Sequence, residues 1–131
     1  MPKNIIRTDS APRPLADYSQ AWTVTDSKLI FVSGQVPVDM DGNKVGVGDI
    51  ALQTRTVLEN VKRVLEGAGA SMQDVIKLST YVTNMVEFRN KAHTIRHEFF
   101  PKDFPASTLV EVKSLAHPEF MIEVEAIAAV G

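Results

Sequence analysis

Two glutamates near the end of the chain, Glu123 and Glu125, are candidates for acid–base chemistry. They belong to a run in which polar and apolar residues alternate, so an extended strand would present both carboxylates on one face, roughly 6.5 to 7 Å apart. Two carboxylates at such a distance can serve as a general acid and a general base, as they do in glycoside hydrolysis. Each glutamate is also compatible with an ordinary position at the surface or beside a subunit interface.

Basic side chains form a second candidate group, on a predicted helix that begins at Asn84. Arg89, His93 and Arg96 lie along one stripe of this helix, and Arg13 lies in a proline-rich loop near the start of the chain. Each is compatible with a solvated charge. Any of them could also bind the carboxylate of a substrate, if the fold brings it to a subunit interface.

Other site motifs are weak in this sequence. His93 and His97 have the i, i+4 spacing of metal ligands on a helix, but no glutamate follows His93 and Arg96 would repel a cation, so we predict no metal site. Ser33 precedes Gly34 at a predicted strand end, without the earlier glycine that a serine-hydrolase elbow needs. The chain has no cysteine, which excludes thiol nucleophiles, disulfides and thiolate metal sites.

The elements that must position these residues follow an α+β order. Alternating or short apolar runs predict strands at 22–25, 28–33, 75–83, 107–112 and 121–127, with a further short strand around 5–6 as an alternative. One amphipathic helix is predicted from the N-cap Asp49 to about Glu66, and a second from Asn84 to Pro101. We therefore expect a five- or six-stranded mixed sheet with two helices packed on one face.

The last two strands have one apolar face and one mixed face. The pattern assigns to the mixed face the residues Ser107, Leu109, Glu111, Glu123, Glu125 and Ile127. The run from Leu29 to Val32 is apolar in both parities, which predicts a strand buried on both sides. Two helices cover only one face of such a sheet, so we predict that a closed homo-oligomer covers the other.

Composition limits the classes of protein to consider. At 131 residues the chain is expected to form a single domain, residues 1–131. A net charge of −2 argues against a polyanion as the main partner, so nucleic acid is not expected. The N-terminal segment lacks the apolar run of a signal peptide, and nowhere is there an apolar stretch long enough to span a membrane, so we expect a cytoplasmic protein with no membrane partner.

Several motifs taken together resemble the Rid family, the reactive intermediate deaminases also called YjgF. They are Tyr18-Ser19-Gln20, the strand end Phe31 to Gln35 (FVSGQ), the helix QTRTVLENVKRVL at 53–65, Tyr81-Val82, and the pattern FPAS…VEV…IEVEAIA from Phe104 onward. The resemblance covers nearly the whole chain. It implies a chorismate-mutase-like α+β subunit and a homotrimer whose sheets line a central barrel, with three pockets at the subunit interfaces and no cofactor.

The resemblance also implies an activity and a set of site residues. Characterised Rid proteins hydrolyse enamines and imines released by pyridoxal-phosphate enzymes, giving a 2-keto acid and ammonia. The family tyrosine matches Tyr18, the backbone amide matches Ser33-Gly34, and the glutamate that positions or activates water matches Glu123. The family arginine that binds the substrate carboxylate is replaced by Ser107.

The missing arginine leaves three hypotheses open, because losing a charge-assisted bidentate contact costs about 2 to 5 kcal/mol. The first is an enamine or imine deaminase with altered substrate range, in which either Arg13 or a basic residue of the second helix such as His93 binds the anion, or the substrate has no carboxylate there. In this hypothesis Leu109 lines the pocket beside Ser107. The second is a non-catalytic trimeric protein that binds a small metabolite or regulates a partner. The third is an endoribonuclease or translation inhibitor, against which the slight acidity counts.

Overall fold

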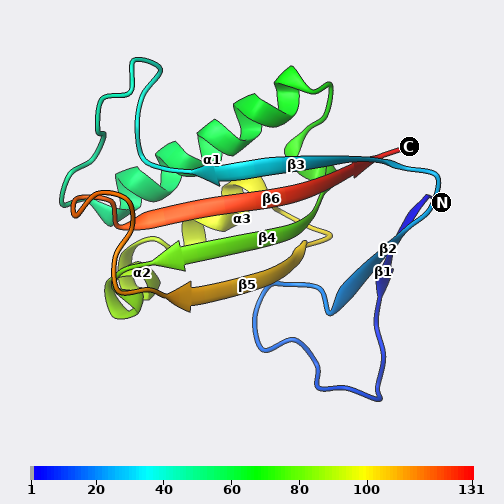
Figure 1. Cartoon of the computed structure of the whole chain (residues 1–131). Helices are drawn as coiled ribbons and strands as arrows, with labels where there is room; N and C mark the ends of the chain where they lie inside the picture. The colour runs from blue at the N-terminus through cyan, green and yellow to red at the C-terminus, as the bar shows by residue number, and fades with distance from the viewer. Residues whose placement is uncertain (1) are drawn as a thin grey trace.

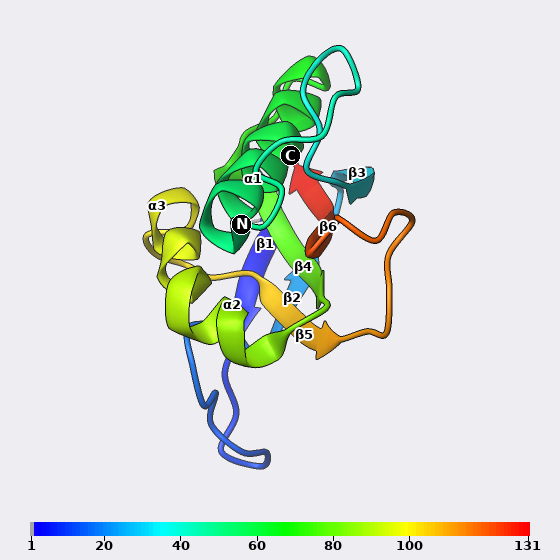
Figure 2. The same cartoon turned by 90° about the vertical axis from the view of Figure 1, so that its left-hand side faces the viewer.

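The computed structural model describes residues 2–131 and places six strands and three α-helices there. A four-stranded mixed sheet has the order β3-β6-β4-β5, and all three helices lie on one of its faces (Figures 1 and 2). The elements are β1 Lys3–Ile6, β2 Ala21–Val24, β3 Lys28–Gln35, α1 Ile50–Gly67, β4 Val75–Val82, α2 Met85–Lys91, α3 Arg96–Phe99, β5 Ala106–Glu111 and β6 Ile122–Val130, with 3-10 turns η1 Met72–Asp74 and η2 His93–Ile95. The predicted α+β class is confirmed.

The core lies between the sheet and α1. β6 is central and antiparallel to both β3 and β4, whereas β5 runs parallel to β4 at the edge. Alternate residues of β6 face the helices and are buried, as the period-two pattern predicted: Ile122, Val124, Ala126 and Ala128. They pack with the apolar stripe of α1, formed by Val57, Leu58, Val61 and Leu65. The helix begins as predicted, because the Asp49 side chain accepts a hydrogen bond from the Leu52 backbone N–H at 3.1 Å.

The second predicted helix is broken into α2, η2 and α3. Its start is as predicted, since the Asn84 side chain caps Glu87 N–H at 3.0 Å. The chain leaves helical geometry at Ala92 (φ −133°, ψ −18°) and then resumes a tighter turn. Ile95 and Phe100 are both buried, although five residues of continuous helix would place them about 140° apart. Phe100 can reach the same core as Ile95 because it lies at the end of α3, where the chain leaves helical geometry again (φ −130°, ψ 76°).

The N-terminal strands form a sheet of their own. Only the polar pair Asp26-Ser27 separates residues 22–25 from residues 28–33, and such a pair suits a hairpin turn. Instead β2 pairs with β1 in a two-stranded antiparallel sheet, and the chain turns at Asp26 (φ +48°) before β3 enters the main sheet. The predicted single sheet of five or six strands is therefore divided into one sheet of two strands and one of four.

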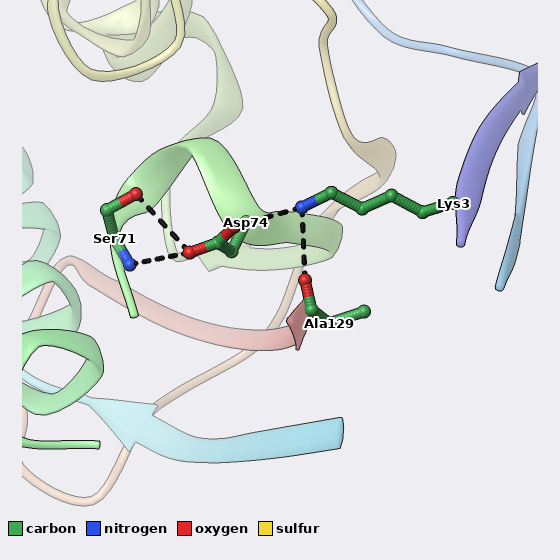
Figure 3. A network of polar contacts seen from close by, with 4 residues as sticks. All are labelled: Lys3, Ser71, Asp74 and Ala129. Atoms are coloured by element: carbon green, nitrogen blue, oxygen red, sulfur yellow. Dashed lines mark hydrogen bonds and ion pairs between the residues drawn. The ribbon is translucent and has the colours of Figure 1, made fainter. Parts of the chain in front are cut away.

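A lysine joins this N-terminal sheet to the body of the protein. Lys3 Nζ donates to Asp74 Oδ1 and to the backbone oxygen of Ala129, each at 3.0 Å (Figure 3). Ser71 N–H donates to the other oxygen of Asp74 at 2.9 Å. Burial by itself raises the pKa of Asp74, but the hydrogen bonds from Lys3 and Ser71 outweigh this effect and hold the pKa below its ordinary value.

The two faces of β5 lie on the opposite sides of the sheet from those that the sequence predicted. β5 pairs in parallel with β4 so that Ser107 lies beside Leu78 and Leu109 beside Thr80, both of which are buried under the helices. Ser107, Leu109 and Glu111 therefore lie on the helix side, whereas Glu123 and Glu125 lie on the open side with Tyr81. The sequence of this edge strand mixes polar and apolar residues in both parities, so only the pairing with β4 decides which face is which.

The open face of the sheet carries apolar side chains without cover in the single chain. Phe31 is 71% exposed and Leu29 is 44% exposed. The prediction that this strand is buried on both sides is therefore not met within one chain, where only Ile30 and Val32 face the helices and the core.

Candidate active site

A pocket opens on the helix side of β5, and we call it the helix-side pocket. Its volume is about 650 Å³. It is lined by Leu15, Ala16, Tyr18, Arg89, His93, Arg96, Ser107 and Leu109. Four of the predicted site residues, from three separate segments, meet here: Tyr18, His93, Ser107 and Leu109.

Tyr18 reaches the pocket because the segment that carries it is held against the start of β5. Ser19 forms a parallel bridge with Ala106, and its backbone N–H donates to Pro105 O at 3.2 Å. The Ser19 hydroxyl also donates to Phe104 O, which accepts a second hydrogen bond from Trp22 Nε1 at 3.1 Å. The Tyr18 hydroxyl accepts from the Leu15 backbone N–H at 3.1 Å, which leaves its own proton available to a ligand.

Arg96 is the cation closest to the position of the family arginine. From the start of α3, its Nη2 donates to the Ser107 hydroxyl at 3.2 Å. Its Nε is fully enclosed and has no hydrogen-bond partner in the described structure. Burial lowers the pKa of Arg96, and Asp17 offsets part of that effect. Asp17 itself contacts His97 Nε2 rather than the guanidinium.

His93 lies in the same cationic surroundings. Burial lowers the pKa of His93 below its ordinary value, and repulsion from Arg96, His97 and Arg89 lowers it further, against a weaker opposing effect of Asp17. Its ring packs edge-on against Phe88, with 6.0 Å between the ring centroids. The imidazole is therefore biased toward its neutral form at neutral pH.

A second group of predicted residues, which we call the sheet-face group, lies at the end of β3 on the open side of the sheet. It consists of Ser33, Gly34 and Glu123. A Cβ atom placed on Gly34 would lie 1.9 Å from Glu123 Oε2, so the carboxylate occupies the space that any larger residue would need. The register between β3 and β6 shifts between Val32 and Gln35, so Ser33 and Gly34 are left without paired residues on β6.

The two glutamates that the sequence paired have different surroundings. Glu125 Oε1 accepts a hydrogen bond from the Tyr81 hydroxyl at 2.8 Å, and this bond is the main reason that the pKa of Tyr81 is raised. Glu123 instead lies against the backbone of Gly34. The arrangement therefore favours Glu123 alone, rather than an acid–base pair, as the group available to a substrate.

The predicted site residues do not lie together within one chain. Tyr18 and Ser107 lie on the helix side of the sheet, whereas Glu123 lies on the open side. Arg13 lines neither the helix-side pocket nor the sheet-face group; it lines a neighbouring cavity of about 730 Å³ beside the N-terminal sheet, which shares Tyr18 with the helix-side pocket. The contact of Arg96 with Ser107 was not predicted. The basic stripe on the second helix was its only signal, and that stripe does not show which member reaches β5.

Residues 2–131 contain neither a metal-binding cluster nor a helix that could span a membrane. No set of three or more His, Asp or Glu side chains among them is arranged to hold a metal ion. None of the helices in this part of the chain is both long and apolar enough to cross a membrane.

Comparison with known proteins places the chain in a family. Residues 8–130 match the family model described as Endoribonuclease L-PSP. The chain belongs to this family. It is 42% identical over 128 residues to a RutC family protein of Pyrococcus abyssi, covering 98% of each chain. It is 38% identical over 130 residues to the 3-aminoacrylate deaminase RutC of Acinetobacter baylyi, covering 99% of this chain and 100% of the relative.

Solved structures of family members have the same fold. YyfB of Yersinia pestis, described as a protein of unknown function of the conserved Rid family, matches with a TM-score of 0.86 and 31% identity, covering 99% of this chain and 100% of that one. A putative endoribonuclease of Thermotoga maritima matches with a TM-score of 0.73 and 36% identity, covering 98% of each. The resemblance to the Rid family is thereby confirmed.

Proposed function

We propose that this protein is a metal-free hydrolase of small imines and enamines, and that its active site forms between two subunits of a homotrimer. The observation that carries the proposal is the separation of the helix-side pocket from the sheet-face group. Each holds part of the residue set that matches the deaminases of the family, and a second copy of the chain would supply the missing part. The similarity to a relative named as a 3-aminoacrylate deaminase supports the same chemistry.

A second copy also has a surface to pack on. Phe31 and Leu29 extend from the open face, where Val110 of β5 is exposed as well. Apolar side chains grouped in this way usually belong to an interface. A neighbour that covers this face would lie beside Glu123, and it would approach with the edge that carries Tyr18 and Ser107. Three such contacts close a ring with three equivalent sites.

The chemistry assigned to the residues is a hydrolysis of the C=N bond. Water adds to the imine carbon while Glu123 accepts one of its protons, and Glu123 then passes this proton to the nitrogen to give a neutral carbinolamine. The carbinolamine loses ammonia when its C–N bond breaks: Glu123 takes the hydroxyl proton and returns it to the leaving nitrogen, and the oxygen becomes the carbonyl of the product. An enamine substrate first takes a proton on carbon to become the imine. Tyr18 donates a hydrogen bond to the bound substrate, and the backbone N–H at Gly34 helps to orient it.

Ammonia release tests the activity directly. The wild-type protein is mixed with freshly generated 2-aminoacrylate, 3-aminoacrylate or 2-iminobutanoate, and the rate is compared with that in buffer. We expect turnover above the spontaneous rate with at least one of these compounds. If none is hydrolysed faster, the hydrolase proposal fails for this substrate class, and non-catalytic metabolite binding becomes the better account of the same pocket.

A subunit-mixing experiment tests whether the site is shared. Tyr18→Phe removes the group that one region contributes, and Glu123→Gln removes the group that the other contributes, so each variant alone should be inactive. Each is assayed alone and after the two are denatured and refolded together. If one chain supplies Tyr18 and its neighbour Glu123, random mixing restores about a quarter of the wild-type sites. A mixture no more active than the separate variants, in the presence of mixed oligomers, would place both residues in the same subunit.

A further inference from the structure

We infer that Arg96 is the anion-binding residue of the helix-side pocket, with the Ser107 hydroxyl as its partner, and that the ligand carries a carboxylate. The inference deepens the proposed function, on which it rests, by naming the substrate class. The charge that the sequence lacks at position 107 is supplied from α3, through a guanidinium that reaches β5 across the pocket.

The hydrogen bonds of Arg96 leave room for a ligand. Its guanidinium has five N–H donors, and the described structure gives one of them a partner, the Ser107 hydroxyl oxygen at 3.2 Å. That contact uses Ser107 as an acceptor and leaves its proton free. A carboxylate beside both residues would accept from the guanidinium and from the serine hydroxyl at once, a charge-assisted arrangement that a planar guanidinium favours.

The charges around the pocket favour an anion. Arg89, His93 and Arg96 all line it, and none of its lining residues is acidic. Asp17 influences the charge of Arg96 and lines a small neighbouring cavity together with it, but its carboxylate contacts His97 and does not line the helix-side pocket. A half-buried guanidinium without an ion-pair partner is costly to maintain, and a bound anion removes that cost.

The apolar residues that line the pocket indicate what kind of group the ligand carries besides its carboxylate. Leu15 and Ala16 come from the N-terminal loop and Leu109 from β5, on the same pocket as Arg96. A carboxylate on a short apolar chain satisfies both kinds of surface. The substrate class is therefore the 2-imino or 2-enamino acids with an apolar side chain, and the product class is the matching 2-oxo acids.

A binding experiment with 2-oxobutanoate tests the inference without requiring turnover. Affinity is measured by calorimetry for the full-length protein and for Arg96→Met, which keeps an unbranched side chain and removes the charge. The neutral amide 2-oxobutanamide serves as the matched ligand, and Arg63→Met, on the exposed face of α1, as the matched variant. We expect Arg96→Met to weaken 2-oxobutanoate binding about tenfold or more, with no comparable effect on the amide.

Restoration of the guanidinium on the other element sharpens the test. The double variant with Arg96→Met and Ser107→Arg should regain 2-oxobutanoate affinity to within about threefold of wild type, because the charge returns to the same pocket. Unchanged affinity in Arg96→Met, or an equal loss for acid and amide, would overturn the inference. If Arg96→Met does not fold, the wild-type protein decides: 2-oxobutanoate should shift the Arg96 Nε–H resonance but not that of Arg63.

The outcome separates this inference from the proposed function. Arg96-dependent binding of 2-oxobutanoate without hydrolysis of any imine would leave the anion site standing and reject the enzyme. If 2-iminobutanoate is hydrolysed and Arg96→Met changes neither KM nor kcat, the enzyme proposal stands and Arg96 is rejected as the anion-binding residue.

Discussion

The helix-side pocket and the sheet-face group hold their polar residues in different ways. In the helix-side pocket, cations line a wide space and Arg96 has donors to spare. In the sheet-face group, the Glu123 carboxylate fills the space beside Gly34 that a side chain at this position would occupy. The first region is suited to binding ligands of varied shape, and the second to holding one reactive group in place. Variants should therefore affect affinity in one region and turnover in the other.

Removing the carboxylate of the sheet-face group should have the largest effect. Glu123→Gln keeps the shape of the side chain but cannot accept the proton from water, so we expect kcat to fall about 10²- to 10³-fold. Steady-state ammonia release measures the effect, with thermal unfolding as a check on folding. Glu125→Gln is the matched control on the same strand face, because Glu125 already bonds Tyr81. Equal losses in both variants would contradict the distinction between the two glutamates.

Displacing the same carboxylate should have the next largest effect. A methyl group at position 34 would overlap Glu123 Oε2, so Gly34→Ala must move the carboxylate, and we expect kcat to fall about tenfold or more. Binding of 2-oxobutanoate in the wide pocket should change much less. Gly67→Ala is the control, since a Cβ there meets nothing within 4 Å. A Gly34→Ala enzyme with wild-type kcat would show that Glu123 is not held as tightly as proposed.

Titration of His93 tests the electrostatics of the other region. Its folded-state pKa is lowered by burial and by Arg96, so NMR titration should place it below the ordinary value of about 6.5, and Arg96→Met should raise it. The unfolded chain binds this proton more readily, so the contribution of His93 to stability falls as the pH drops through about 6.5. A pKa that Arg96→Met leaves unmoved would show that the two side chains are not coupled.

Removing the ion pair that attaches the N-terminal sheet to the rest of the protein should have the smallest effect, and that effect should be on stability. Lys3→Met removes the ion pair with Asp74, which we expect to cost about 0.5 to 1 kcal/mol of unfolding free energy. The pKa of Asp74 is lowered in the folded state, so this contribution is present above about pH 4 and is lost as the pH falls further. Urea unfolding at pH 7 and pH 3 measures both. A difference between wild type and variant that persists undiminished at pH 3 would assign the effect to packing or to the hydrogen bond with Ala129 O, rather than to the charge of Asp74.

The sequence predicted those parts of the molecule that depend on local pattern. The stripe of α1, its Asp49 cap and the buried residues of β6 follow from periodicity and capping. The faces of β5 do not, because an edge strand with polar residues in both parities takes its orientation from its partner β4. The pairing of β2 with β1 depends equally on long-range contacts.

The site was predictable to a similar extent. Motif resemblance identified Tyr18, Ser107 and Glu123, and the structure adds that they lie on two faces of the sheet. The contact between Arg96 and Ser107 could not be predicted, since it depends on the break in the second helix. An uninterrupted helix would have placed the same basic stripe at a different angle to β5.

The break at Ala92 makes the reach of Arg96 sensitive to the number of residues in this segment. Because an α-helix turns about 100° per residue, one residue more or fewer before α3 would rotate its side chains away from β5. A guanidinium would then have to reach the pocket from another element, such as position 107. The length of this segment and the residue at 107 are therefore coupled: a single insertion would alter ligand preference without replacing any residue that lines the pocket.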